Sequence, residues 1–150
     1  ITLTGSVPGV EGLSIGLGYA TSNYELPAAQ TQVKDEGTAY VKYAYGPLTF
    51  GAQVGKVSDK GLGTIGYKNN YYGISYAVSD DLSISYNRLE AIKTGGSNSF
   101  NRVQQDFNSI SLSYSMGGMT IGVADADCDN CSWTSAKSQD ETTVSLSVAF

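Results

Sequence analysis

The residues of this chain that could do chemistry are concentrated near its carboxyl end, where Cys128 and Cys131 form a CxxC motif. Such a motif can be a redox pair, a metal clip or a disulfide. A redox pair favours a helix amino terminus, which the surrounding pattern does not predict. Zinc would need two more soft ligands, and the 150-residue chain has two cysteines and no histidine. We therefore predict a disulfide that closes a small surface loop in an oxidising compartment.

Asp125, Asp127 and Asp129 alternate through the same stretch and look like the start of a calcium-binding loop. The full EF-hand pattern fails, because Asn130 stands where the loop needs glycine and Ala136 where it needs glutamate. A looser calcium site on the three aspartates stays open beside a solvated acidic loop. We expect no other cofactor.

The absence of histidine argues against an enzyme. Ser-His relays, many metal sites and most general-base chemistry at neutral pH depend on imidazole. The adjacent Asp80 and Asp81 are expected to cap a tight turn. The net charge is −5 and no basic stripe runs along the chain, so nucleic acid is not an expected partner.

Apolar residues recur at every second position along most of the chain, which is the period of a β-strand. In 109–116, Ile110, Leu112, Tyr114 and Met116 alternate with serines. Similar alternation predicts strands in 13–20, 38–45, 48–55, 72–78, 82–87, 119–124 and 142–150, and 1–5 already alternates like a strand. Short turns at 7–9, 46–47, 79–81 and 117–118 alternate with long loops at about 22–36, 58–69, 90–106 and 125–141.

Tight turns at one end of a meander and long loops at the other are typical of outer-membrane barrels. We predict an all-β, antiparallel, up-and-down transmembrane β-barrel, with residues 1–150 as one segment of about nine strands. The odd strand count and the opening in mid-strand predict that amino-terminal strands are missing. A soluble sandwich is the weaker alternative, because the polar faces are small and nearly uncharged and the loop lengths alternate strictly.

A membrane barrel carries apolar residues outside and polar residues inside. The lumen residues are then expected to include Tyr40, Lys42, Gln53, Asn87, Ser111, Ser113 and Ser145. Aromatic girdles at the two rims are expected from Tyr45, Tyr76, Tyr114 and Phe150 at the short turns and Tyr19, Tyr72 and Tyr86 at the long loops. Lys56 and Arg88 share the lipid-face parity near the outer rim, where they could reach lipid phosphates or stay solvated.

The run 113–124, followed by an Asp-rich loop and the closing strand 142–150, resembles the last hairpin of alphaproteobacterial general porins. Val144, Leu146, Val148 and Phe150 resemble the signal read by the outer-membrane insertion machinery. The resemblance implies the carboxyl-terminal half of a sixteen-stranded barrel, integral to the outer membrane of a Gram-negative bacterium. It also implies a homotrimer and passive diffusion of small hydrophilic solutes and ions. Lys42, and Lys93 or Arg102, match as basic pore or mouth residues. A complete small barrel with a structural or adhesive role stays the alternative.

Overall fold

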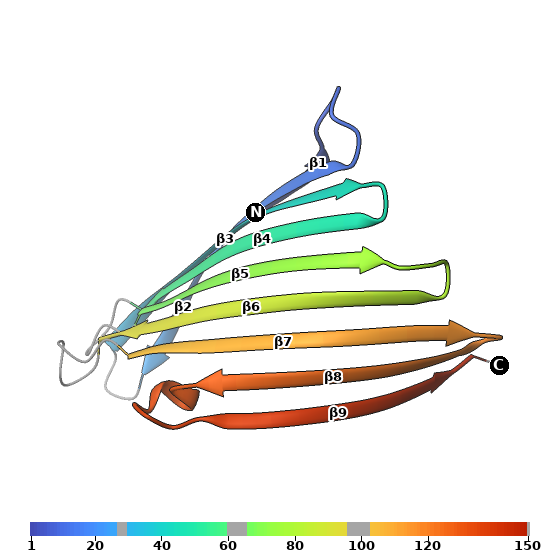
Figure 1. The fold of residues 1–150 in the computed structure, drawn as a ribbon. Helices are drawn as coiled ribbons and strands as arrows, with labels where there is room; N and C mark the ends of the chain where they lie inside the picture. The colour runs from blue at the N-terminus through green and yellow to red at the C-terminus, as the bar shows by residue number, and fades with distance from the viewer. Residues whose placement is uncertain (27–29, 60–65, 96–102, 150) are drawn as a thin grey trace.

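The computed structural model describes residues 1–26, 30–59, 66–95 and 103–149, and these form one antiparallel sheet of nine strands. Every strand pairs with the next one along the chain, and β1 and β9 do not pair with each other, so the sheet is open (Figure 1). The strands are β1 (Thr2–Ser6), β2 (Leu13–Leu26), β3 (Gln30–Tyr45), β4 (Leu48–Asp59), β5 (Gly66–Ala77), β6 (Leu82–Thr94), β7 (Val103–Met116), β8 (Met119–Asp129) and β9 (Gln139–Val148). The predicted all-β, up-and-down architecture is confirmed.

The long loops are shorter than the sequence pattern predicts, because the strands continue into them. β6 reaches Thr94 and β7 begins at Val103, whereas the pattern predicts a loop over 90–106. Near these ends Leu89, Ala91 and Phe107 lie on the face that carries small polar residues elsewhere, so the apolar alternation changes phase and does not reveal the extensions. Backbone hydrogen bonding between strands does not depend on side-chain polarity. It pairs Glu90 with Asp106 as regularly as it pairs Ile84 with Leu112.

Toward the short turns, the register keeps two chemically different faces separate from β3 to β9. Residues directly opposite each other in an antiparallel pair share a face. One connected row on the first face is apolar throughout: Tyr45, Leu48, Tyr76, Ile84, Leu112, Val123 and Val144. The neighbouring row on the other face is small and mostly polar: Ala44, Thr49, Ser75, Ser85, Ser111, Ala124 and Thr143.

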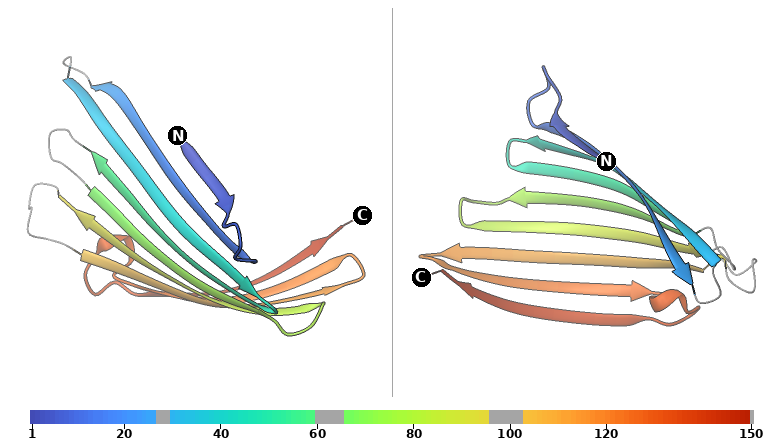
Figure 2. Two further views of the ribbon diagram at one scale, coloured as in Figure 1. Left: turned by 90° about the horizontal axis from the view of Figure 1, so that it is seen from above. Right: turned by 180° about the vertical axis from the view of Figure 1, so that it is seen from behind.

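The sheet curves into an open trough (Figure 2). Along β7 the apolar side chains of 110–116 are exposed and the serines between them are half-buried, which places the apolar face on the convex side. The apolar side chains are the exposed ones: Ile110 is 51% exposed and Val144 is 72% exposed. Among the described residues, the only buried hydrophobic side chains are Ala91, Ile92, Cys128 and Cys131. A soluble domain buries its apolar side chains in a shared core, and this sheet does the reverse.

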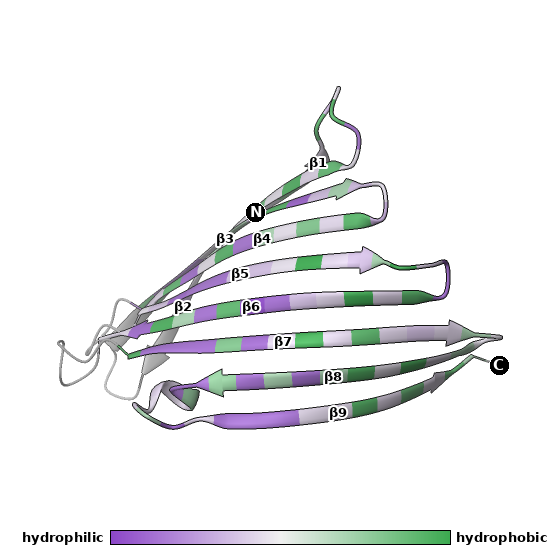
Figure 3. Ribbon diagram, viewed as in Figure 1, coloured by the Kyte–Doolittle hydropathy of each residue, from purple (hydrophilic) through white to green (hydrophobic). Residues whose placement is uncertain are grey.

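The apolar residues form a band that lies toward the short-turn ends of the later strands, whereas the long-loop ends are hydrophilic (Figure 3). On β7 the band runs from Ile110 to Met116, about 20 Å along the strand. In the part of the chain that the structure describes, no helix is both long and apolar enough to cross a membrane. The short 3-10 helix η1 (Cys131–Trp133) follows β8.

The short turns step steadily along the strands from one hairpin to the next (Figure 1). Leu48, in the last pair of the β3–β4 hairpin, aligns through Tyr76 and Ile84 with Leu112 on β7. The last pair of the β7–β8 hairpin is Met116 with Met119, so the turn has moved four residues (112 to 116) over four strands. A shift of one residue per strand is about 3.3 Å along the strand for every 4.8 Å across the sheet. Strands tilted by about 35° would therefore bring all of the short turns to the same height. Barrels need a tilt of this size to close.

Gly12 docks the first turn against the third strand. Its φ is +79°, its carbonyl oxygen accepts a hydrogen bond from the Ala44 amide at 2.9 Å, and a Cβ there would lie 2.1 Å from the Ala44 carbonyl oxygen. Gly9 in the same turn also has a positive φ, +82°, but faces open space. Gly55 on β4 has neither constraint.

These three glycines separate backbone strain from steric clash. We expect Gly12→Ala to lower the free energy of unfolding by about 2–4 kcal/mol, since it combines left-handed strain with overpacking. Gly9→Ala should cost about 1 kcal/mol, from the left-handed conformation alone, and Gly55→Ala should be close to neutral. Equilibrium urea unfolding, followed by the fluorescence of Trp133, measures all three. Equal losses at Gly9 and Gly12 would show that the Ala44 contact does not constrain the turn.

Candidate functional site

The concave polar face is the candidate site. All of the residues predicted for a lumen lie on it, as the register shows: Tyr40 opposite Gln53, Lys42 opposite Gly51, Asn87 opposite Gly73, Ser111 opposite Ser85, Ser113 opposite Ser83 and Ser145 opposite Gly122. The structure therefore brings these residues together on one surface, although they come from five different strands.

Glycines on the concave face let the larger polar side chains lie flat against the sheet. A Cβ at Gly16 would lie 2.1 Å from the Tyr40 ring, and one at Gly73 would lie 2.9 Å from Asn87 Oδ1. Each glycine is thus overlain by the residue directly opposite it. Because these side chains lie along the sheet, they project little from the concave face.

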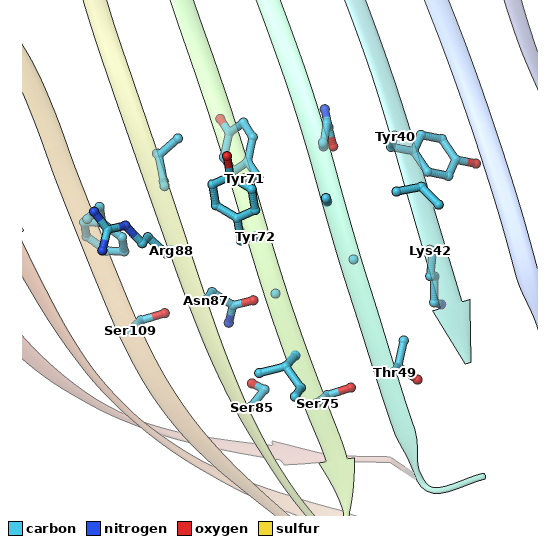
Figure 4. A pocket seen from close by; sticks show the side chains of 18 residues that line it. Tyr40, Lys42, Thr49, Tyr71, Tyr72, Ser75, Ser85, Asn87, Arg88 and Ser109 are labelled. Atoms are coloured by element: carbon cyan, nitrogen blue, oxygen red, sulfur yellow. The ribbon is translucent and has the colours of Figure 1, made fainter. Parts of the chain in front are cut away.

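An open hollow of about 610 Å³ lies along β3 to β7. Its side chains on the concave face include Tyr40, Lys42, Gln53, Tyr71, Asn87 and Ser109, and Figure 4 shows most of these among the side chains that line it. Arg88 also borders the hollow but belongs by parity to the convex face. The lining has no carboxylate, histidine or cysteine, so it offers no nucleophile paired with a base. The lining combines polar side chains such as Lys42, Asn87 and Ser109 with the apolar surface of Tyr71, Leu89 and Phe107.

Hydroxyl groups on this face bond to one another across strands. Ser85 Oγ and Ser111 Oγ are 2.6 Å apart, and Ser115 Oγ and Thr120 Oγ1 are 2.9 Å apart. A hydroxyl has one donor and two acceptor sites, so each pair retains capacity for water. The face is neutral, hydrogen-bonding and almost free of charge along its middle.

The predicted girdle tyrosines all lie on the convex face, which is the apolar one. Tyr45, Tyr76 and Tyr114 lie toward the short turns, and Tyr19, Tyr72 and Tyr86 lie where the apolar band gives way to polar residues. At that upper boundary, Tyr19 Oη donates to Asp35 Oδ1 at 3.2 Å and Tyr86 Oη donates to Asn108 Oδ1 at 3.0 Å. A ring on the apolar band with a hydroxyl on its polar edge is the amphipathic arrangement of an interfacial tyrosine. Phe150 lies outside the described residues.

Tyr43 is an aromatic residue of the convex face that the predicted aromatic girdles did not include. Its ring stacks on that of Tyr45, with centroids 6.4 Å apart and an interplanar angle of 20°. Its parity on β3 matches that of Tyr45, and this could have identified it from the sequence.

Charged and amide side chains form a polar border above the apolar band on the convex face. Arg88 Nη2 lies 3.1 Å from Glu90 Oε1 and 3.4 Å from Asp106 Oδ1, so the guanidinium is paired with two carboxylates of the protein itself. Lys56 lies directly opposite Lys68, and both are exposed. The structure thus places the two predicted rim cations in different surroundings, with Arg88 in an ion-pair network.

The structure does not gather the three aspartates of the calcium hypothesis around one point. Asp125 Oδ2 accepts a hydrogen bond from Thr142 on β9 at 2.7 Å, and Asp127 Oδ2 accepts one from Asn108 on β7 at 3.0 Å. Their side chains therefore bond to opposite neighbouring strands. Over residues 1–26, 30–59, 66–95 and 103–149, no group of three or more His, Cys, Asp or Glu side chains is placed to hold a metal ion.

Cys128 and Cys131 are joined in a disulfide, with their Cα atoms 5.7 Å apart. The turn that the disulfide closes continues into η1. Asn130, directly before η1, and Ser132 and Trp133 within it all have positive φ angles near 55°. Left-handed conformations in residues other than glycine cost roughly 1–2 kcal/mol each. The turn therefore depends on the contacts that surround it.

Trp133 and Tyr67 are site residues that the sequence pattern did not reveal. Their ring centroids are 5.4 Å apart, and the Lys93 ammonium lies 5.8 Å from the Tyr67 centroid and 5.7 Å from the Trp133 centroid. Lys93, a predicted mouth residue, is thus in a double cation–π contact, whereas Arg102 lies outside the described residues. Hydrophobic periodicity does not extend into turns, so the only available signal was the chain's single tryptophan close after the CxxC motif.

Comparison of the chain with protein-family models, with curated proteins and with solved structures finds no match. The fold and the site define the chain as an open, curved, up-and-down antiparallel sheet, apolar on its convex side and polar on its concave side.

Proposed function

We propose that this chain forms part of the wall of an outer-membrane diffusion porin, whose water-filled barrel passes small hydrophilic solutes and ions. The observation that carries the proposal is the reversed burial: large apolar side chains are exposed over a continuous convex face of nine strands. Exposed apolar patches on soluble monomers rarely exceed a few hundred Å². Lipid is the partner that covers such a face on a sheet with polar residues on its other side.

The geometry of the convex face supports lipid contact. The apolar band is bounded on one side by tight turns and on the other by ion pairs and amides, with tyrosines near both edges. Outer-membrane barrels carry an apolar band about 25 Å tall between aromatic girdles. All strands from β2 to β9 have 10–16 residues, enough for the roughly 9–11 needed to span the hydrocarbon when tilted.

The stagger of the turns supports closure into a barrel. The open edges of β1 and β9 would leave backbone N–H and C=O groups without partners in lipid, which costs several kcal/mol per group. Additional strands pairing with these edges remove that cost. Sixteen strands and a homotrimer are part of the proposal through the resemblance of 113–124 and 142–150 to general porins.

The concave face supports a wide passage more than a narrow one. Eight-stranded barrels fill their interior with side chains, whereas barrels of sixteen to eighteen strands leave an aqueous channel. Serine, threonine and glycine dominate the middle of this face, where the charged side chain is Lys42. Solutes would exchange hydrogen bonds with water and hydroxyls, and the net charge of −5 would give a weak preference for cations.

Single-channel recording in a planar lipid bilayer tests the proposal. The natural, detergent-extracted protein should produce stable current steps that arrive in threes, with weak cation preference. An absence of conductance from folded, heat-modifiable protein would contradict the porin function. It would favour a closed small barrel with a structural or adhesive role.

A pair of neighbouring substitutions tests which face meets lipid. Leu112→Arg puts a charge in the middle of the apolar band, and we expect it to lower folding stability in lipid vesicles by about 2–4 kcal/mol. Ser111→Arg puts the same charge on the concave face and should cost less than about 1 kcal/mol. Urea titrations in vesicles give both values. Similar losses of stability at the two positions would contradict a sheet with lipid on one face and water on the other.

A further inference from the structure

The connection between β8 and β9 folds over the concave face. By the register, Cys128 lies on that face, opposite Phe107 and Gln139, and it is 9% exposed. Cys131 is 5% exposed. Figure 2 shows η1 on the inner side of the trough, beside the ends of β6 and β7. The disulfide-closed turn therefore packs against the sheet, although turns between strands usually project from it.

Several hydrogen bonds fix this turn to β7. Asn130 Nδ2 donates to the Gln104 carbonyl oxygen at 2.9 Å, and the Ser132 amide donates to Gln105 Oε1 at 3.0 Å. The turn is also closed on itself, because the Cys131 amide donates to the Lys137 carbonyl oxygen at 2.8 Å. The disulfide, the β7 contacts and the internal bonds together hold one conformation.

Trp133 extends from this turn across the sheet. It contacts Tyr67 on β5 and Lys93 on β6, while the turn itself begins at the end of β8. Strands β5 and β8 are three steps apart, about 14 Å at the usual strand spacing. A bulky aromatic side chain therefore covers the concave face near the long-loop ends of β5 and β6.

We propose that the disulfide-closed β8–β9 turn is a built-in constriction, which narrows the passage by fixing Trp133 over Tyr67 and Lys93. This inference rests on the proposed porin function. A solute would meet two aromatic rings and one ammonium group at this level, instead of the small hydroxyls lower down. The constriction would thus select by size, and Lys93 would place one positive charge beside the two rings, with Glu36 farther along the same row of paired residues.

Single-channel conductance of the full natural protein carrying Trp133→Ala tests the constriction. Loss of the ring should raise the conductance about 1.2- to 2-fold, because the aqueous cross-section sets the current through a wide barrel. Trp133→Phe is the matched control, since it retains an aromatic ring, and it should stay closer to wild type. Reducing the disulfide of the wild-type protein should change the conductance in the same direction as Trp133→Ala, which avoids any folding defect of the variant.

Charge at the constriction is tested separately. Lys93→Gln should shift the reversal potential in a salt gradient toward stronger cation preference, while Lys68→Gln on the convex face should leave it near the wild-type value. If wild type conducts but Trp133→Ala, reduction and Lys93→Gln all leave conductance and selectivity unchanged, the constriction is overturned and the porin function stands. If the folded wild-type protein does not conduct, the porin function itself has failed.

Discussion

The uninterrupted backbone register is the constraint on which the rest of this structure depends. Alternation within one strand only divides that strand into two sides. The pairing of all nine strands in phase joins those sides into two continuous faces, so that Leu112 meets Ile84 and Val123 while Ser111 meets Ser85 and Ala124. A slip of one residue at any strand would move its apolar side chains to the polar face.

The two faces explain the unusual energetics of the sheet. Without a shared hydrophobic core, the described residues bury too little apolar surface to offset the conformational entropy of folding in water. In the proposed porin, backbone hydrogen bonds and contact with lipid would take the place of the core, and in lipid every backbone group has to be paired. The steady stagger serves the same requirement, because a tilt of about 35° allows a sheet to close without edges.

Much of the architecture follows from the sequence because period two is a strong signal wherever apolar and small polar residues alternate. It identified the strands, the convex and concave sets and the short turns. The same signal predicted strand ends that are too early, near residues such as Glu90 and Asp106. Backbone pairing continues there, although the regular alternation of apolar and polar side chains does not. Turns have no such period. The inward packing of 128–137 and the contact of Trp133 with Tyr67 depend on tertiary contacts between distant segments, which neither residue type nor spacing encodes.

The central claim, that the apolar face meets lipid and the polar face meets water, is tested most directly by spin labelling along β7. Nitroxide labels are placed one at a time at positions 110–114, in protein carrying Cys128→Ser and Cys131→Ser and refolded into lipid vesicles. Collision rates are measured with oxygen, which concentrates in lipid, and with a water-soluble nickel chelate. The account predicts maximal oxygen contact at Ile110, Leu112 and Tyr114 and maximal nickel contact at Ser111 and Ser113. Accessibility without this two-residue period, or with the opposite phase, would contradict it.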